Sequence, residues 1–302
     1  MKLLHILKEG KIRLAVSTNN GVLDIVETGQ AYQVQVPYTL KQLISQEDGL
    51  ETIEDIIERA SKNNPELFTP EEQIEYGPSV NDPEKIICIG LNYIDHAEES
   101  KMDIPKEPIV FSKFNNSLAA HNQAVALPEI ATKYDYEAEL VIIIGKEGSN
   151  IPEDEAHRYI FGYTVGNDLS ARDLQFKSGQ WLIGKTLNDF APVGPYVVPS
   201  SVIKDPHNLN IECHVNGETR QKANTKDMIF NCYTIISYLS KYVTLKPGDV
   251  IFSGTPDGVI LGYPEEKQDW LTPEDEIVVT IENIGTLSNK LVRSKHKVAL
   301  EK

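Results

Sequence analysis

Short apolar runs rich in β-branched residues recur along the chain. Residues 86–90, 141–145 and 159–166 have this pattern and each run ends at glycine, which is typical of buried strands. Residues 250–252 follow a turn and predict another strand, and the alternating segment 276–292 predicts a closing strand pair. Most of the chain is therefore expected to be β-structure.

The first part of the chain has a different pattern. Residues 1–36 are expected to form short strands, because turn residues such as Asn19, Asn20 and Gly21 separate alternating segments. Two helical segments follow, and the second has an apolar face made of Leu50, Ile53, Ile56, Ile57 and Ala60. The pattern predicts an α+β protein, mainly β, with a small α/β domain at 1–78 and a larger domain at 79–302.

Several local signals complete the predicted elements. Asn92 is placed to cap a short helix, and Pro152 marks the start of another. Residues 214–219 predict a hairpin turn, and residues 225–242 predict a helix with one apolar face. The polar segment 263–275 reads as an inserted loop.

Composition and charge exclude several functions. The chain of 302 residues is 40% apolar and 25% charged, as in ordinary folded proteins, and carries a formal net charge of -16. This charge disfavours nucleic acid, no apolar run could span a membrane, and charge interrupts the N-terminus too early for a signal peptide. Cys88, Cys213 and Cys232 lack the spacing of a zinc site and are expected to be buried thiols. We expect a cytoplasmic protein.

Two glutamates lead into the strand predicted at 141–145. Glu137 and Glu139 point the same way, because side chains alternate faces along a strand. Two carboxylates at the start of a buried strand require a positive partner, and a divalent cation is the simplest. Asp168 follows the strand predicted at 159–166 and can reach the same place. The alternatives are a solvated edge strand for the glutamates and a helix cap or turn for Asp168.

His96 and Glu99 are candidates for a general base and the carboxylate that orients it. Their spacing of three makes them neighbours on the short helix predicted after Asn92. A carboxylate beside an imidazole fixes its tautomer and stabilises its cation, which is the simplest general-base arrangement. The alternative is a surface ion pair without function.

Two loops have candidate binding chemistry. Residues 179–186 match the phosphate-binding pattern Gly-x4-Gly-Lys-Thr, but polar residues precede them and Pro192 prevents a following helix. We therefore reject a nucleotide site. The turn at 253–258 contains Gly254 and Thr255, whose N–H and hydroxyl groups could bind an anion, or it is an ordinary tight turn.

Taken together, these motifs resemble the fumarylacetoacetate hydrolase family. The similarity extends from about Ile86 to Val292. The segments that carry it, in the order of the family, are 89–96, 136–140, 166–175, 184–195, 224–230 and 247–259. Loops at 114–117, 121–123, 260–264 and 274–275 depart from the family pattern, so the resemblance does not identify one substrate.

The resemblance implies a mixed β-sandwich roll and a divalent ion held by Glu137, Glu139 and Asp168. An all-oxygen ligand set suits Mg²⁺ or Mn²⁺ and would also accept Ca²⁺. It also implies homodimers and a lid that carries the His96–Glu99 dyad. The residues implied to bind substrate are Arg172, Gln175, Lys185, Gly254 and Thr255, and Lys185 is also implied to be catalytic.

Family members share substrates with a 2-keto acid or β-dicarbonyl unit. We expect an enzyme that stabilises an enolate, and we rank hydrolysis of a C–C bond in an acylpyruvate first. An oxaloacetate-type decarboxylase or a keto–enol or double-bond isomerase is the alternative on the same site. A non-catalytic binding protein that kept the fold is the alternative of another class.

Overall fold

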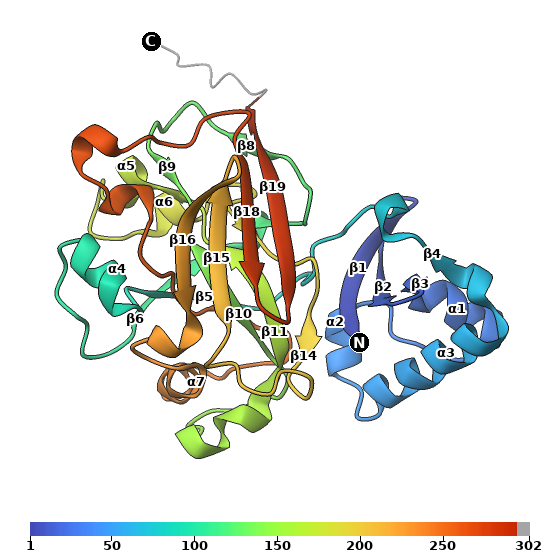
Figure 1. Ribbon diagram of the computed structural model, residues 1–302. Helices are drawn as coiled ribbons and strands as arrows, with labels where there is room; N and C mark the ends of the chain where they lie inside the picture. The colour runs from blue at the N-terminus through green and yellow to red at the C-terminus, as the bar shows by residue number, and fades with distance from the viewer. Residues whose placement is uncertain (295–302) are drawn as a thin grey trace, which may run out of the picture.

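The structure is a computed structural model that describes residues 1–294. Two sheets lie face to face in the larger part of the molecule (Figure 1). The first has six strands in the order β14 (Val198–Pro199), β11 (Ile160–Asn167), β10 (Ala138–Ile144), β17 (Val250–Phe252), β5 (Ile86–Gly90) and β6 (Ile109–Lys113). The second has five strands in the order β16 (Glu218–Asn224), β15 (Asn210–Val215), β18 (Glu276–Ile281), β19 (Gly285–Arg293) and β8 (Val125–Leu127).

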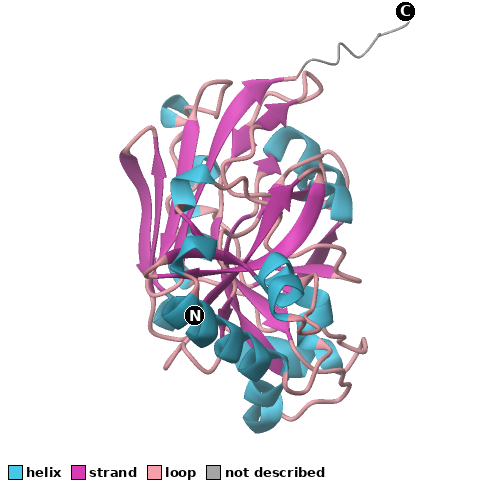
Figure 2. Ribbon diagram, turned by 90° about the vertical axis from the view of Figure 1, so that its right-hand side faces the viewer, coloured by secondary structure: helices cyan, strands magenta, loops and turns pink. Residues whose placement is uncertain are grey.

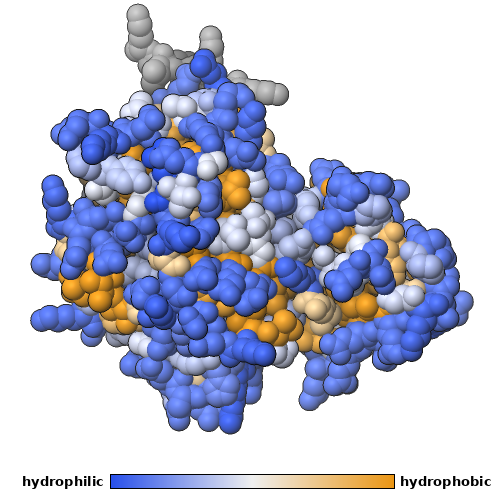
Figure 3. All heavy atoms as spheres, in the orientation of Figure 1, coloured by the Kyte–Doolittle hydropathy of each residue, from blue (hydrophilic) through white to orange (hydrophobic). Residues whose placement is uncertain are grey.

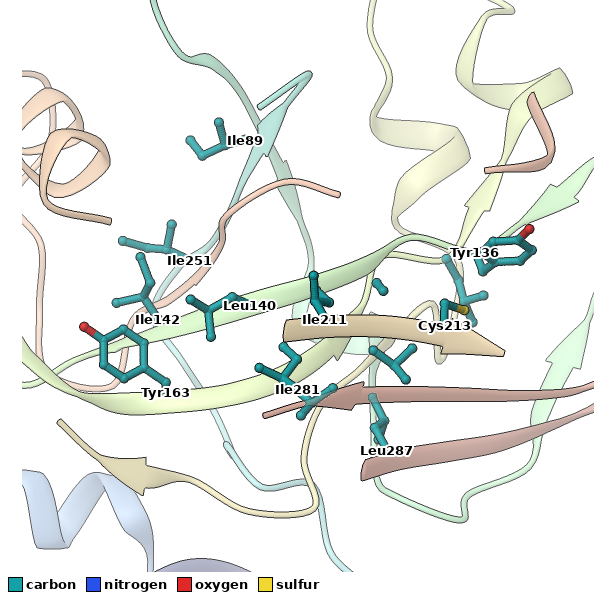
Figure 4. Packing of buried hydrophobic residues seen from close by; sticks show 14 of the residues in the cluster. Ile89, Tyr136, Leu140, Ile142, Tyr163, Ile211, Cys213, Ile251, Ile281 and Leu287 are labelled. Carbon is teal, nitrogen blue, oxygen red and sulfur yellow. The ribbon is translucent and has the colours of Figure 1, made fainter. Parts of the chain in front are cut away.

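The core of the sandwich lies between these sheets. Leu140 and Ile142 of β10 and Tyr163 of β11 face Ile211 of β15 and Ile281 of β18 (Figure 4). All five are almost completely buried, and burying such side chains is the main favourable term in folding. The strands predicted from apolar runs are thus the inner strands of the sandwich.

β10 is buried on both faces. Ala138, Leu140 and Ile142 belong to the cluster between the sheets, whereas Val141 and Ile143 belong to a second cluster on the opposite face. This alternation explains why the apolar run is continuous instead of alternating with polar residues. The N-terminal region covers part of that opposite face, because its Leu3, Ile53 and other apolar residues belong to the same cluster.

The N-terminal region has its own sheet and three helices. The strands pair antiparallel in the order β1 (Lys2–Lys8), β2 (Lys11–Thr18), β3 (Gly21–Asp24) and β4 (Phe68–Thr69). The helices are α1 (Ile25–Tyr32), α2 (Leu40–Ile44) and α3 (Gly49–Asn63). Figure 2, viewed from the side of this region, shows its helices in front of the sandwich strands. Leu3 of β1 pairs with Val197, so the region is hydrogen-bonded to the sandwich beside β14.

The structure corrects several predicted elements. Residues 25–32 form a helix instead of a strand, because Asp24 accepts a hydrogen bond from Glu27 N and caps it. Asn92 caps no helix: its side chain bonds to the backbone of Phe230 and Ser253. The helix predicted at 225–242 is shorter, since a 3₁₀ turn at Thr225–Asp227 precedes α7 (Cys232–Ser240), which Asn231 caps.

The remaining elements are short. The other α-helices are α4 (Ile94–Glu99), α5 (Arg172–Gln175) and α6 (Leu182–Lys185), and the two-stranded ladders are β9 (Tyr134–Asp135) with β12 (Ser170–Ala171) and β7 (Leu118–Ala119) with β13 (Ala191–Pro192). The 3₁₀ helices besides Thr225–Asp227 are Pro65–Leu67, Glu71–Gln73, Asn115–Ser117, Glu153–Tyr159, Ile260–Gly262 and Glu265–Lys267. The predicted helix after Pro152 is therefore of the 3₁₀ type.

The predicted fold class, a mixed β-sandwich roll with a small α/β N-terminal region, is confirmed. The hairpin predicted at 214–219 joins β15 and β16. The division at residue 78 stays a prediction. Within residues 1–294, no helix has the length and apolar content that crossing a membrane requires.

Candidate metal centre and active site

Three predicted ligands lie together at one end of the six-stranded sheet. Glu137 precedes β10, Glu139 belongs to it, and both lie on the face opposite the sandwich core. Asp168 follows β11, and its N–H donates to Glu137 O at 2.9 Å. Carboxylate oxygens of the three residues lie within 4.8 Å of one another, and all three residues are buried. β10 pairs with a strand on each side, so the solvated edge-strand alternative is wrong.

Three buried cations surround these carboxylates. Lys185 Nζ lies 2.6 Å from Glu137 Oε2 and 3.0 Å from Asp168 Oδ2. Lys113, the last residue of β6, donates to Asp168 Oδ1 and, at 3.0 Å, to Leu169 O. Arg172 Nη1 lies 2.8 Å from Glu137 Oε1. Buried charges of both signs are tolerated only when they are paired in this way.

Burial and charge act differently on the two glutamates. Burial alone would raise the pKa of Glu137, but Lys185 and Arg172 outweigh it and hold that pKa below its usual range. Burial, together with the charges of Asp168 and Glu137, raises the pKa of Glu139 well above its usual range. Glu139 receives one hydrogen bond, from Gly254 N at 2.7 Å. A cation would lower the cost of ionising Glu139, because it would offset the neighbouring negative charges.

The donor set fits a hard divalent cation. Glu137, Glu139 and Asp168 supply only oxygen, which Mg²⁺, Mn²⁺ and Ca²⁺ prefer. The helix-cap alternative for Asp168 is wrong, because the N-cap of α5 is Ala171 and the Asp168 carboxylate accepts from Lys113 and Lys185. These residues could therefore hold a metal ion, as predicted.

His96 faces the same pocket and is paired with Glu99. His96 Nδ1 lies 2.8 Å from Glu99 Oε1, and Glu99 Oε2 accepts from Gly258 N at 2.9 Å. His96 is buried and lines a pocket together with Glu137, Glu139 and Lys185. The pair is therefore not an exposed surface ion pair. The pocket has a free volume of about 30 Å³, which is room for only a few waters, so a larger ligand needs its walls to move.

Most of the predicted substrate-binding residues line the pocket, but Gly254 does not. Arg172, Gln175 and Thr255 line the pocket, and Arg172 Nη1 donates to Gln175 Oε1 at 2.9 Å. Arg172 Nη2 lies 2.8 Å from Asp135 Oδ2, so the guanidinium is paired with Asp135 as well as with Glu137. The N–H of Gly254, predicted to bind an anion, is instead bonded to Glu139.

The opposite wall of the pocket is aromatic. Phe111 and Trp181 pack edge to face with ring centroids 5.4 Å apart, and Lys185 Nζ lies 5.0 Å from the centre of the Phe111 ring. Trp181 rests on Gly90, where any Cβ would come within 2.6 Å of its ring. Lys185 ends α6 and is buried among carboxylates, so the segment at 179–186 has no phosphate-binding geometry.

Sequence reasoning missed two site residues. Lys113 had a weak signal, because it is a single lysine at the end of a short apolar strand. Asp135 had a stronger one: residues 135, 137 and 139 share a side by the alternation that paired the glutamates. Asp135 is fully buried and contacts Arg172, because β9 pairs with β12 immediately before Arg172.

Comparison with known proteins agrees with this geometry. The model of the fumarylacetoacetate hydrolase C-terminal family matches residues 85–292. The chain belongs to the fumarylacetoacetate hydrolase family. The resemblance inferred from the sequence motifs is thus confirmed, and the match includes all the predicted site residues.

Members of this family with different activities resemble the chain. It is 39% identical over 289 residues to oxaloacetate tautomerase fahd2, mitochondrial, of Xenopus laevis. The aligned part is 93% of this chain and 86% of that protein. The fold matches fumarylacetoacetate hydrolase from Exiguobacterium antarcticum with TM-score 0.80 and 29% identity, over 97% of this chain and 100% of the other. It also matches maleylpyruvate hydrolase from Sphingobium sp. SYK-6 in complex with manganese(II) and pyruvate, with TM-score 0.77 and 28% identity, over 98% and 100%.

Proposed function

We propose that this protein is a divalent-metal-dependent enzyme that acts on small 2-keto acids through an enolate. The observation that carries the proposal is that Glu137, Glu139, Lys185 and His96 line one pocket, with Asp168 beside the glutamates and Glu99 bonded to His96. A scaffold protein would have no need to bury so many ionisable groups around one pocket. A non-catalytic role is therefore the weaker alternative.

The chain's own residues have distinct roles in this proposal. A divalent cation held by Glu137, Glu139 and Asp168 would act as a Lewis acid toward the oxygens of a 2-keto acid. Lys185 places a positive charge where the enolate oxygen develops, and Arg172, which lines the pocket, binds a carboxylate. His96, oriented by Glu99, moves the proton. The helix α4 that carries the pair closes over the substrate and excludes water.

Keto–enol tautomerisation of an oxaloacetate-type acid is the reaction we favour. It requires one proton-transfer group, and His96 can take a proton from the carbon beside the keto group and return it to oxygen or carbon. The similarity to an oxaloacetate tautomerase over most of both chains supports this choice. Hydrolysis of an acylpyruvate, ranked first from the sequence, is the second candidate, and similarity to a maleylpyruvate hydrolase favours it. Hydrolysis would require His96 to deprotonate water.

One experiment separates these reactions. The purified protein, with Mn²⁺ or with EDTA, is given oxaloacetate and an acylpyruvate, and enol absorbance, CO₂ release and acid products are followed. Tautomerase activity predicts a metal-dependent change in enol absorbance without CO₂ or cleavage products. Cleavage of the acylpyruvate alone would reverse the ranking, and no metal-dependent reaction with any substrate would leave only the binding-protein alternative.

We also propose that the protein is a homodimer. Val110, Phe114, Tyr242 and Val243 are exposed and line an open groove beside β6, the last strand of its sheet. Figure 3 shows apolar surface in the region where Figure 1 draws α4 and β6. A free strand edge beside apolar side chains is a suitable surface for a second copy. Light scattering coupled to size-exclusion chromatography tests this, and a monomer at all concentrations would contradict it.

A further inference from the structure

Asp135 is a buried carboxylate that connects two parts of the site. Its Oδ2 accepts from Arg172 Nε at 2.9 Å and from Leu261 N at 3.1 Å. Its Oδ1 accepts from Ile260 N at 2.9 Å and from Tyr136 N at 2.9 Å. Asp135 is fully buried and lines no part of the pocket. It therefore cannot contact substrate directly, and its charge is used entirely by these four groups.

The loop at 258–262 extends from Asp135 to the His–Glu pair. Gly258 N donates to Glu99 Oε2 at 2.9 Å, and Gly258 O accepts from Tyr136 Oη at 2.8 Å. Leu261 lines the pocket, and a Cβ on Gly262 would collide with the Glu99 carboxylate. Both ends of the loop, Gly258 and Gly262, therefore lie against Glu99, and Asp135 binds the backbone of Ile260 and Leu261 between them.

We infer that Asp135 is a positioning residue that aligns Arg172 and, through the loop at 258–262, Glu99. The inference rests on the proposed function, in which Arg172 binds a substrate carboxylate and Glu99 orients His96. Arg172 has two anionic partners, Asp135 on one side and Glu137 on the other. Asp135 keeps the guanidinium from turning, so that Nη1 stays against Glu137 and Gln175 at the pocket. By fixing Ile260 and Leu261, it also keeps Gly258 and Gly262 against Glu99.

The alignment of Arg172 and the alignment of Glu99 should affect different kinetic constants. Asp135→Asn preserves size but removes the charge and places N–H₂ hydrogens near Arg172 or Leu261 N. At saturating Mn²⁺ we expect a higher KM, because Arg172 is misaligned, and a lower kcat, because Glu99 is released. Misplacement of this kind lowers kcat/KM by roughly 10- to 100-fold. Gly262→Ala displaces the Glu99 carboxylate alone, so it should lower kcat and leave KM nearly unchanged.

Asp249→Asn is the matched control. Asp249 is also fully buried and accepts from two backbone N–H groups, those of Lys85 and Lys246, and from Lys85 Nζ at 2.8 Å. It does not line the pocket. The control should lower the melting temperature as Asp135→Asn does, because each variant weakens a similar set of hydrogen bonds, but it should leave KM and kcat unchanged.

Hydrogen exchange provides a readout that does not depend on turnover. Asp135→Asn should speed amide exchange in peptides covering 258–263 and also in those covering 93–100, which Asp135 does not touch. If Asp135→Asn changes only the melting temperature, as the control does, the inference is wrong. If Gly262→Ala folds and keeps its kcat, the loop does not position Glu99. If the unchanged protein converts no 2-keto acid, the proposed function fails, while exchange in 93–100 and calorimetric binding of pyruvate with Mn²⁺ still test the role of Asp135.

Discussion

Buried polar groups are treated in opposite ways in the N-terminal region and at the site. His5 of β1 is fully buried, and both ring nitrogens have a single neutral partner: Nδ1 donates to Pro78 O at 2.7 Å, and Nε2 accepts from Leu40 N at 2.9 Å. At the site, Glu137, Glu139 and Asp168 are buried against one another and depend on cations. The first arrangement is complete without a ligand, whereas the second leaves Glu139 beside two carboxylates and without an ion pair among the described residues, which a cation can relieve.

This difference separates residues that serve stability from residues that serve chemistry. Changes in the N-terminal region should alter unfolding and spare turnover. Changes at Glu99 or Glu139 of the site should alter turnover or metal binding and should cost little stability, or even increase it. The following predictions test that separation.

The largest effect is expected at Glu99. Glu99→Gln keeps the shape but removes the charge that orients His96, so kcat should fall by roughly 10²–10⁴-fold. The melting temperature should change little, because Glu99 is only partly buried. Steady-state kinetics and calorimetry on one preparation measure both quantities. If Glu99→Gln also lowers the melting temperature strongly, the distinction between the two regions does not hold.

In the N-terminal region, Ile53→Ala should be strongly destabilising. Ile53 of α3 is completely buried in the cluster that also packs against the six-stranded sheet. Removing this side chain leaves a cavity and should cost about 2–5 kcal/mol in the free energy of unfolding. Urea unfolding measures the cost, and kcat of the folded protein should be unchanged. A large fall in kcat below the unfolding transition would show that the N-terminal region also shapes the site.

His5 should make stability depend on pH. Burial lowers the pKa of His5 from 6.5 to about 4 in the folded protein, more than its bond to Pro78 raises it. As pH falls below 6.5, the unfolded chain binds a proton first, so stability is lost between pH 6.5 and 4. The loss integrates to about 3 kcal/mol. The free energy of unfolding should fall between pH 6.5 and 4 more steeply in the unchanged protein than in His5→Gln. The same dependence on pH in both proteins would contradict the prediction.

The smallest effect is a gain of stability at the site. Glu139→Gln removes one of the mutually repelling buried carboxylates, so the metal-free protein should become more stable by on the order of 1 kcal/mol. Mn²⁺ should raise the melting temperature of the unchanged protein but much less that of the variant, because a ligand is lost. Calorimetry with and without Mn²⁺ measures both effects. Equal stabilisation by Mn²⁺ would exclude Glu139 as a ligand.

Much of the fold could be predicted from local pattern. Runs such as 141–144 are apolar on both faces and can be stable only inside a sheet covered on two sides. The alternation that places Glu137 and Glu139 together is a property of the backbone, so the sequence already implied that part of the site. The predictions that were wrong concern elements with weak local preferences. The helix α1 has only a capping aspartate and a short apolar face. Asn92 donates to distant backbone carbonyls instead of capping a helix.

The cations and the connections between loops were decided only by tertiary structure. Lys113 reaches Asp168 across 55 positions of the sequence, and Asp135 reaches Leu261 across 126. No periodicity relates such residues, because their distance in space is set by which strands pair and how the loops between them cross. The sequence by itself determined which carboxylates share a face. Only the packed sandwich decided which positive charges and which loop meet them.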